Sequence, residues 1–225
     1  KDRYYLYRSH WQKEQHTIHL LPHWTWGKSR RGEVTPVYCY TDYPEAELFL
    51  NGKSQGRIKK LQEQPGQWNN ASKSEQEKTR LDRYRLRWNE VKYEPGELRV
   101  VVFDENGKKC GEQTMKTAGK PTRLQLDVWT QSTPSSPSNQ NSQSTQSNPN
   151  NQSSQSILKA DGQDLAFVTV SLTDKDGTLI PDAQDQLVFK VTGAGTFRGV
   201  CNGDATSLES FTEPTMKLFN GQLVV

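Results

Sequence analysis

Short segments in which apolar and polar residues alternate constrain the fold of this chain most strongly. Successive side chains of a β-strand point to opposite faces of a sheet, so alternation predicts strands with one buried and one solvated face. In the first half of the chain, such segments lie at residues 17–21, 33–41, 46–50, 53 onward, 84–88, 96–103 and 110–117. Asn51-Gly52 and Asn106-Gly107 lie where tight hairpin turns would need positive φ angles. About seven short strands in roughly 100 residues predict a small antiparallel β-sandwich.

The second half of the chain repeats this pattern. Its alternating segments lie at residues 122–128, 166–172, 186–191, 195–201 and 219–225. The chain is therefore predicted to be all-β, with two consecutive immunoglobulin-like antiparallel β-sandwiches. The boundary falls in Thr117-Ala118-Gly119-Lys120-Pro121, which gives sandwiches at residues 16–118 and 119–225.

A tract at residues 131–156 contains only Ser, Thr, Asn, Gln and Pro. It offers no charge and no side chain that could anchor a core, so it is predicted to be disordered and mobile. Because residues 122–128 already read as a sandwich strand, we interpret the tract as a loop insertion inside the second sandwich rather than as an interdomain linker. The tract accounts for part of the low mean hydropathy of −0.91.

Residues 1–13 are predicted to form a short helix before the first sandwich. Tyr4, Tyr7, Arg8 and Trp11 recur at spacings of three and four residues, which places them on one helix face. An isolated helix of this length is marginal in water, so its aromatic face requires a partner. The chain does not begin with Met, and we expect that partner in sequence upstream of it.

Charge and hydropathy argue against a nucleic-acid partner and against a membrane-spanning helix. Residues 1–120 carry 23 Lys and Arg against 16 Asp and Glu, whereas residues 121–225 carry 6 against 10. A basic half can indicate a nucleic-acid partner, but here both signs are interleaved, as at residues 75–83, which indicates a solvated surface. A membrane-spanning helix needs about 20 consecutive apolar residues, and the sequence has no such run. We expect neither a nucleic-acid partner nor a membrane span.

Candidate metal and catalytic residues are sparse. His19 and His23 have a zinc-ligand spacing only if they lie on a helix, and Pro22 argues against one. Ordinary hydrogen-bonded histidines are the better interpretation. The aspartates of the second half show no EF-hand spacing. Glu45 and Glu47 share a strand face, but they flank exposed turn residues and do not resemble a glycosidase pair. No metal, cofactor or catalytic residue is predicted.

The three cysteines, Cys39, Cys110 and Cys201, leave at least one thiol unpaired within the chain. Cys39 lies in an alternating strand and is predicted to be a small buried hydrophobic residue. A disulfide between Cys39 and Cys110 stays open as an alternative.

The most suggestive binding feature is the pair Trp24 and Trp26. In an extended segment both would project to the same face. An exposed Trp can stack on the apolar face of a sugar ring while its indole N–H donates to a hydroxyl, so both are candidate substrate-binding residues. The alternative, which we favour, is that both pack against the preceding helix or another domain.

Several longer stretches carry a specific resemblance: Lys1–Trp11, His19–Trp26, Val34–Tyr38, Tyr43–Ser54, Leu158–Leu165, Val191–Thr196 and Asn202–Ser207. They resemble the C-terminal region of β-galactosidase-like enzymes of glycoside hydrolase family 2. The resemblance implies that residues 1–15 are the last helix of a catalytic (β/α)8 barrel. It also implies a small post-barrel sandwich and an invasin-type, immunoglobulin-like module. In that family the two catalytic glutamates lie on upstream barrel strands, and no residue here matches either of them.

The resemblance implies a non-catalytic accessory region of a secreted enzyme that hydrolyses terminal β-galactosides with retention. The expected partners are the barrel and N-terminal domains of the same chain, with carbohydrate as a further candidate. The segment alone is expected to be inactive, and a periplasmic or extracellular bacterial location is expected. The alternative function is a pair of carbohydrate-binding modules that target the enzyme to polysaccharide through exposed Trp residues. A cell-surface adhesion module is a third reading, which the barrel-type helix argues against.

Overall fold

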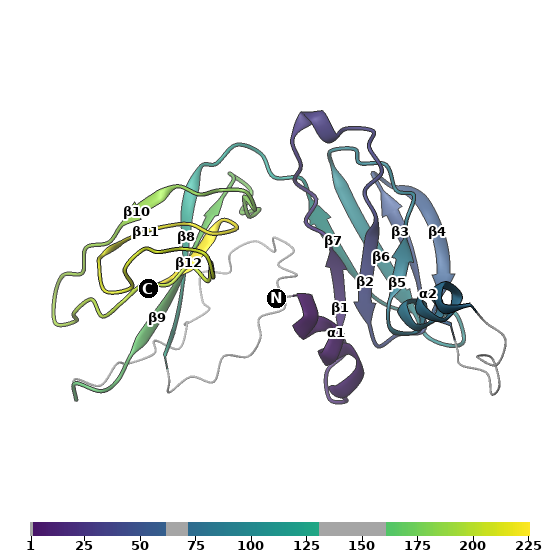
Figure 1. The fold of residues 1–225 in the computed structure, drawn as a ribbon, viewed down its shortest axis with the longest axis horizontal. Helices are drawn as coiled ribbons and strands as arrows, with labels where there is room; N and C mark the ends of the chain where they lie inside the picture. The colour runs from purple at the N-terminus through teal and green to yellow at the C-terminus, as the bar shows by residue number, and fades with distance from the viewer. Residues whose placement is uncertain (1, 62–71, 131–160) are drawn as a thin grey trace, which may run out of the picture. The chain divides into compact units, whose positions relative to one another are not determined.

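A computed structural model describes residues 2–61, 72–130 and 161–225 (Figure 1). The chain divides into two compact units, Lys1–Thr117 and Ala118–Val225, and each is described by itself. The predicted insertion at residues 131–156 lies outside the described residues.

Over residues 2–61 and 72–117, the first unit contains two antiparallel sheets, two α-helices and a short 3-10 helix. The three-stranded sheet has the order β1-β2-β5, and the four-stranded sheet has the order β4-β3-β6-β7. The strands are β1 (Ile18–Leu21), β2 (Val37–Thr41), β3 (Glu45–Leu50), β4 (Lys53–Lys59), β5 (Leu86–Trp88), β6 (Glu97–Phe103) and β7 (Lys109–Lys116). The helices are α1 (Asp2–Trp11), the short 3-10 helix η1 (Lys28–Arg30) and α2 (Lys73–Tyr84).

Side chains from both sheets form the core of the first unit, as the alternation predicts. Leu20, Val37 and Cys39 come from the three-stranded sheet, and all are fully buried. Leu48 and Val100, which are register partners on β3 and β6, come from the four-stranded sheet. The predicted Asn-Gly hairpin is also confirmed, because Asn51 and Gly52 have φ angles of 50° and 79° between β3 and β4. The all-β prediction is therefore correct for this unit.

Helix α2 was not predicted, because its residues were interpreted only as a solvated segment of mixed charge. That segment is exposed, but it is helical, and strand β5 begins at Leu86 rather than at residue 84. A capping box starts the helix: the Ser72 hydroxyl accepts the Glu75 N–H, and the Glu75 carboxylate accepts the Ser72 N–H. Both contacts satisfy backbone donors that have no partner within the helix. The Ser-x-x-Glu signal was present in the sequence.

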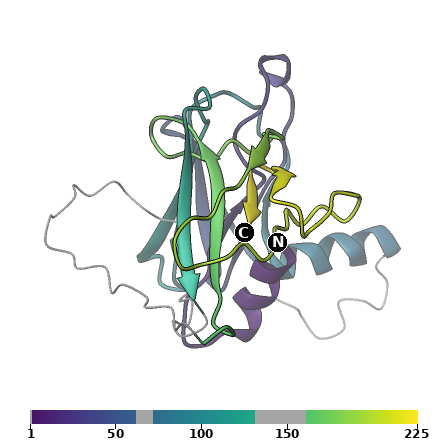
Figure 2. The ribbon, with the colours of Figure 1, turned by 90° about the vertical axis from the view of Figure 1, so that its left-hand side faces the viewer.

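Over residues 118–130 and 161–225, the second unit also contains two antiparallel sheets. One has the order β12-β9-β8, and the other pairs β10 with β11. The strands are β8 (Arg123–Thr130), β9 (Ala166–Thr173), β10 (Gln186–Val188), β11 (Thr215–Lys217) and β12 (Gln222–Val224). Figure 2 shows β8 and β9 running side by side. The core contains Val170, Ile180, Ala183, Val200, Met216, Leu218 and Leu223. These sheets are consistent with the predicted second sandwich.

One predicted strand of the second unit is absent. Residues 195–201 form no strand, and Cys201 makes only an isolated bridge with Val224. Glycine weakens a strand because it loses much backbone entropy and packs no side chain, and this segment contains Gly195 and Gly199. The apolar residues of the segment are therefore held by loop contacts instead of a ladder.

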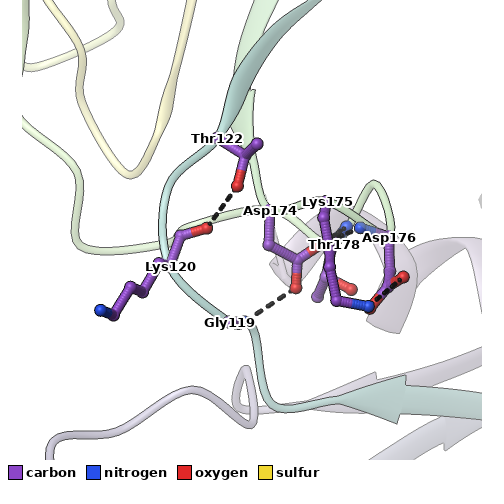
Figure 3. A network of polar contacts seen from close by, with 7 residues as sticks. All are labelled: Gly119, Lys120, Thr122, Asp174, Lys175, Asp176 and Thr178. Atoms are coloured by element: carbon purple, nitrogen blue, oxygen red, sulfur yellow. Dashed lines mark hydrogen bonds and ion pairs between the residues drawn. The ribbon is translucent and has the colours of Figure 1, made fainter.

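A buried carboxylate organises the start of the second unit (Figure 3). Asp174 accepts the backbone N–H of Gly119 at 2.7 Å, of Asp176 at 2.9 Å and of Thr178 at 2.8 Å. Burial alone would raise the pKa of Asp174, but the three donated N–H groups outweigh it and lower the pKa below its ordinary value. The ionised side chain therefore ties the chain entry at Gly119 to the turn after β9.

Candidate functional site

One face of α1 is anchored to the first unit. The Tyr5 ring stacks on the His19 ring, with centroids 3.7 Å apart and planes 8° apart. His19 Nε2 lies 3.1 Å from Asp2 Oδ1, and His10 Nε2 lies 3.2 Å from the Tyr84 carbonyl oxygen. Burial lowers the pKa of His10, which favours the neutral imidazole as the donor to that carbonyl. These contacts fix the helix against β1 and the end of α2.

The opposite face of α1 carries exposed aromatic residues. Tyr4 is 55% exposed, Tyr7 51% and Trp11 74%, and they recur at three- and four-residue spacing along the helix. The Tyr7 and Trp11 rings stack with centroids 4.8 Å apart. We call Tyr4, Tyr7 and Trp11 the aromatic face of α1. Large apolar rings gathered on one exposed face mark an interaction site more often than scattered ones do.

Trp24 lies in the core of the first unit. It is 1% exposed, its Nε1–H donates to the Glu94 carbonyl at 3.0 Å, and its ring meets the Tyr93 ring edge-to-face. The Thr117 hydroxyl donates to the Trp24 carbonyl at 2.6 Å. The indole therefore offers no open face within this unit, and the partners seen, Tyr93 and Glu94, belong to the same unit rather than to the preceding helix or another domain.

Trp26 lies at the margin of the same core. The Arg30 guanidinium is 4.6 Å from the Trp26 ring centroid, and the His23 ring centroid is 4.1 Å away. The Tyr93 hydroxyl accepts the Trp26 backbone N–H and donates to the Trp26 carbonyl, each at 3.2 Å. Trp26 Nε1 is buried and meets no acceptor among the described residues. The structure does not bring Trp24 and Trp26 together on an exposed face, and substrate contact at Trp26 stays a prediction.

The other candidate residues have structural partners. His16 pairs with Asp42. Together with the contacts of His10 and His19 described above, this confirms the prediction of hydrogen-bonded histidines for these three residues. The Arg57 guanidinium beside Glu45 lowers the pKa of that carboxyl, and Glu47 accepts the Ser54 hydroxyl at 2.6 Å. Both glutamates are therefore engaged by side chains of β4.

The cysteines are free thiols, so the disulfide alternative for Cys39 and Cys110 is wrong. Cys39 is buried as predicted, and burial raises its pKa to about 12. Over residues 2–61, 72–130 and 161–225, no group of three or more His, Cys, Asp or Glu side chains could hold a metal ion. The same ranges contain no helix that is long and apolar enough to span a membrane.

Comparison with known proteins decides the family. The model of glycoside hydrolase family 2 C-terminal domain 5 matches residues 150–225, and a domain of unknown function, DUF4982, matches residues 32–111. The β-galactosidase BoGH2A of Bacteroides ovatus is 37% identical over the whole chain, which covers 21% of that protein. The chain consists of C-terminal accessory domains of glycoside hydrolase family 2.

Other relatives of these family 2 domains are also longer proteins. A putative β-glucuronidase of Formosa agariphila is 30% identical over 99% of the chain, which covers 17% of that protein. A crystal structure of a β-glycosidase from Bacteroides vulgatus matches with a TM-score of 0.71 and 26% identity, over 100% of this chain and 23% of that one. The family 2 domains described here thus span about a fifth of the length of the curated relatives they match.

Proposed function

We propose that the chain is a non-catalytic support of a β-galactosidase-type glycoside hydrolase, and that the aromatic face of α1 packs against the catalytic barrel of the same polypeptide. The observation that carries the proposal is the two-sided character of α1. Tyr5, His10 and His19 hold one side on the first unit, while Tyr7 and Trp11 point away from it. The relatives, which are longer chains, supply further domains that could cover this face.

The energetics favour such a contact. Burial of apolar surface contributes about 25 cal/mol per Å², and a Tyr or Trp side chain can bury roughly 150–250 Å². Because contacts within the first unit already order α1, docking would cost little additional conformational entropy. The first unit would then fix the position of the helix and support the barrel from outside.

The substrate of the whole protein is part of the proposal. We infer a terminal β-galactoside, because the β-galactosidase relative aligns over the entire chain at 37% identity and the putative β-glucuronidase at 30%. Release of p-nitrophenol from the aryl β-galactoside, compared with the aryl β-glucuronide, tests this choice.

We also propose export to the periplasm or beyond the cell, which fractionation of the source cells tests.

The scaffold role is tested in the whole polypeptide with the double variant Tyr7→Ala/Trp11→Ala. We expect the apparent melting temperature of the catalytic domain to fall and heat inactivation to accelerate, since central aromatic anchors of an interface contribute about 2 kcal/mol or more. Phe211→Ala, which removes an exposed aromatic ring from the second unit, is the matched control. Unchanged melting and unchanged heat inactivation in the double variant would refute the proposal.

The carbohydrate-binding alternative receives no support from Trp24. Stacking on a sugar requires an accessible ring face, and Trp24 is enclosed by Tyr93 and the surrounding core. We therefore do not extend the proposed function to a sugar site at this residue.

A further inference from the structure

An aromatic pair lies on the outer face of the β8–β9 hairpin strands. Trp129 and Phe167 are register partners, and their rings stack with centroids 4.2 Å apart and planes 13° apart. Val168 and Val170 belong to the opposite, core-facing side of β9. The aromatic pair therefore lies on the side of the sheet that faces away from the core.

The indole of Trp129 is partly exposed. Among the described residues β8 is the edge strand of the sheet β12-β9-β8, and the Phe167 ring on β9 stacks on one face of the indole. Trp129 is 37% exposed among the described residues, so part of the indole is accessible. An edge strand also presents backbone N–H and C=O groups that no neighbouring strand pairs.

Polar side chains continue the same face along β8. At two-residue intervals before Trp129 lie Asp127, Gln125 and Arg123, and all three are exposed. Two residues of a strand span roughly 6.8 Å. Measured along β8, Asp127 therefore lies about one sugar-ring width from Trp129, and Gln125 lies about two. Thr169 stands opposite Asp127 on β9 and adds a hydroxyl.

This combination matches the chemistry of a pyranose. The C–H face of the ring stacks on an indole, and its hydroxyls donate to carboxylates and exchange hydrogen bonds with amides. Asp127 would repel an anionic sugar, and residues 118–225 carry 7 Lys and Arg against 10 Asp and Glu. We propose that Trp129, Asp127 and Gln125 form a binding site for neutral pyranose residues of a glycan chain, independent of the docking of α1.

The site is tested in the whole polypeptide by retardation in native gels that contain soluble neutral galactan, with polygalacturonate as the acidic probe. We expect neutral galactan to retard the wild type, and Trp129→Ala to weaken this binding by about tenfold, the factor that corresponds to losing one stacking contact. Asp127→Ala, at an exposed position, should also weaken binding. Phe211→Ala should bind as the wild type does.

Thermal unfolding of each variant separates lost binding from lost folding, and Asp127→Ala keeps the test decisive if Trp129→Ala unfolds the second unit. Equal retardation of the wild type, Trp129→Ala and Asp127→Ala would overturn the site. So would a wild type that is retarded by polygalacturonate alone. Failure of the scaffold role would appear instead in the melting of Tyr7→Ala/Trp11→Ala, so the two proposals fail separately.

Discussion

Leu126 and Val170 are register partners on the same face of their sheet, yet Leu126 is 61% exposed and Val170 is 2% exposed. Val170 belongs to the second core together with Met216 and with Leu223, its register partner on β12. Among the described residues, the core side chains thus cover Val170 on β9 but leave Leu126 on β8 exposed. Leu124 and Val128, which flank Leu126 on the same face, are exposed as well.

This contrast predicts that truncating Val170 and Leu126 to Ala lowers the free energy of unfolding by different amounts. Val170→Ala should lower the free energy of unfolding of the second unit by about 2 kcal/mol, because it removes buried methyl groups and leaves a cavity. Leu126→Ala should change it by less than about 0.5 kcal/mol. Urea unfolding of the chain, followed by a probe in the second unit, measures both. Equal costs would show that Leu126 is covered in solution.

The capping box of α2 predicts a local effect. Ser72→Ala removes the hydroxyl that accepts the Glu75 N–H and should destabilise the helix by about 1 kcal/mol. Amide exchange in the first turn of α2 should accelerate, while exchange in the core strand β6 should not. Lys78→Ala, at an exposed position in the same helix, is the control and should leave exchange nearly unchanged. Equal acceleration in both variants would contradict a capping role.

Local patterns made some of these features predictable. Alternation and Asn51-Gly52 identified the strands and the first hairpin, because both depend on residues close together in the chain. Helix α2 has no buried residue, so it lacks the apolar periodicity that a helix prediction uses, and only Ser72 and Glu75 signalled its start. Local sequence could not place Trp24 inside the core, because its partners come from residues about 70 positions away.

The site proposed at Trp129, Asp127 and Gln125 could not be predicted from the sequence for a related reason. The segment at residues 122–128 was recognised as a strand, but Trp129 lay one residue beyond it and its partner Phe167 belongs to β9. Trp24 and Trp26 could be proposed as a pair because they lie only two residues apart in the sequence. Exposure depends on which strand lies at the edge of a sheet, which alternation alone does not specify.

The buried carboxylate of Asp174 predicts a pH dependence. Its pKa is lowered in the folded chain, so its contribution to stability is present above the unfolded value, about 3.9, and is lost as pH falls through the lower folded value. Asp174→Asn should destabilise the second unit near pH 7 by about 2 kcal/mol, because it loses charge-assisted hydrogen bonds and sets an amide against buried N–H donors.

The measurement for Asp174 compares unfolding of the wild type and the variant between pH 7 and pH 3. The difference between them should shrink as the pH falls below about 4, because Asp174 of the unfolded chain then becomes protonated before Asp174 of the folded chain does. Lys175→Ala, which removes an exposed ion pair with Asp176 but no bond to Asp174, serves as the control and should cost little at any pH. A pH-independent difference for Asp174→Asn would rule out the ionised state as the cause.

Two glycines with nearly the same backbone conformation predict different costs for the same substitution. Gly221 and Gly203 have φ angles of 74° and 77°, so Ala at either position pays the steric cost of the left-handed region, about 1–2 kcal/mol. A Cβ at Gly221 would also lie 2.1 Å from the Ile180 carbonyl oxygen, whereas a Cβ at Gly203 meets nothing within 4 Å. Gly221→Ala must therefore displace backbone next to β12 and should destabilise the second unit by more than about 3 kcal/mol, well beyond Gly203→Ala. Thermal unfolding of both variants measures the difference, and similar melting temperatures would refute the close approach of Gly221 and Ile180.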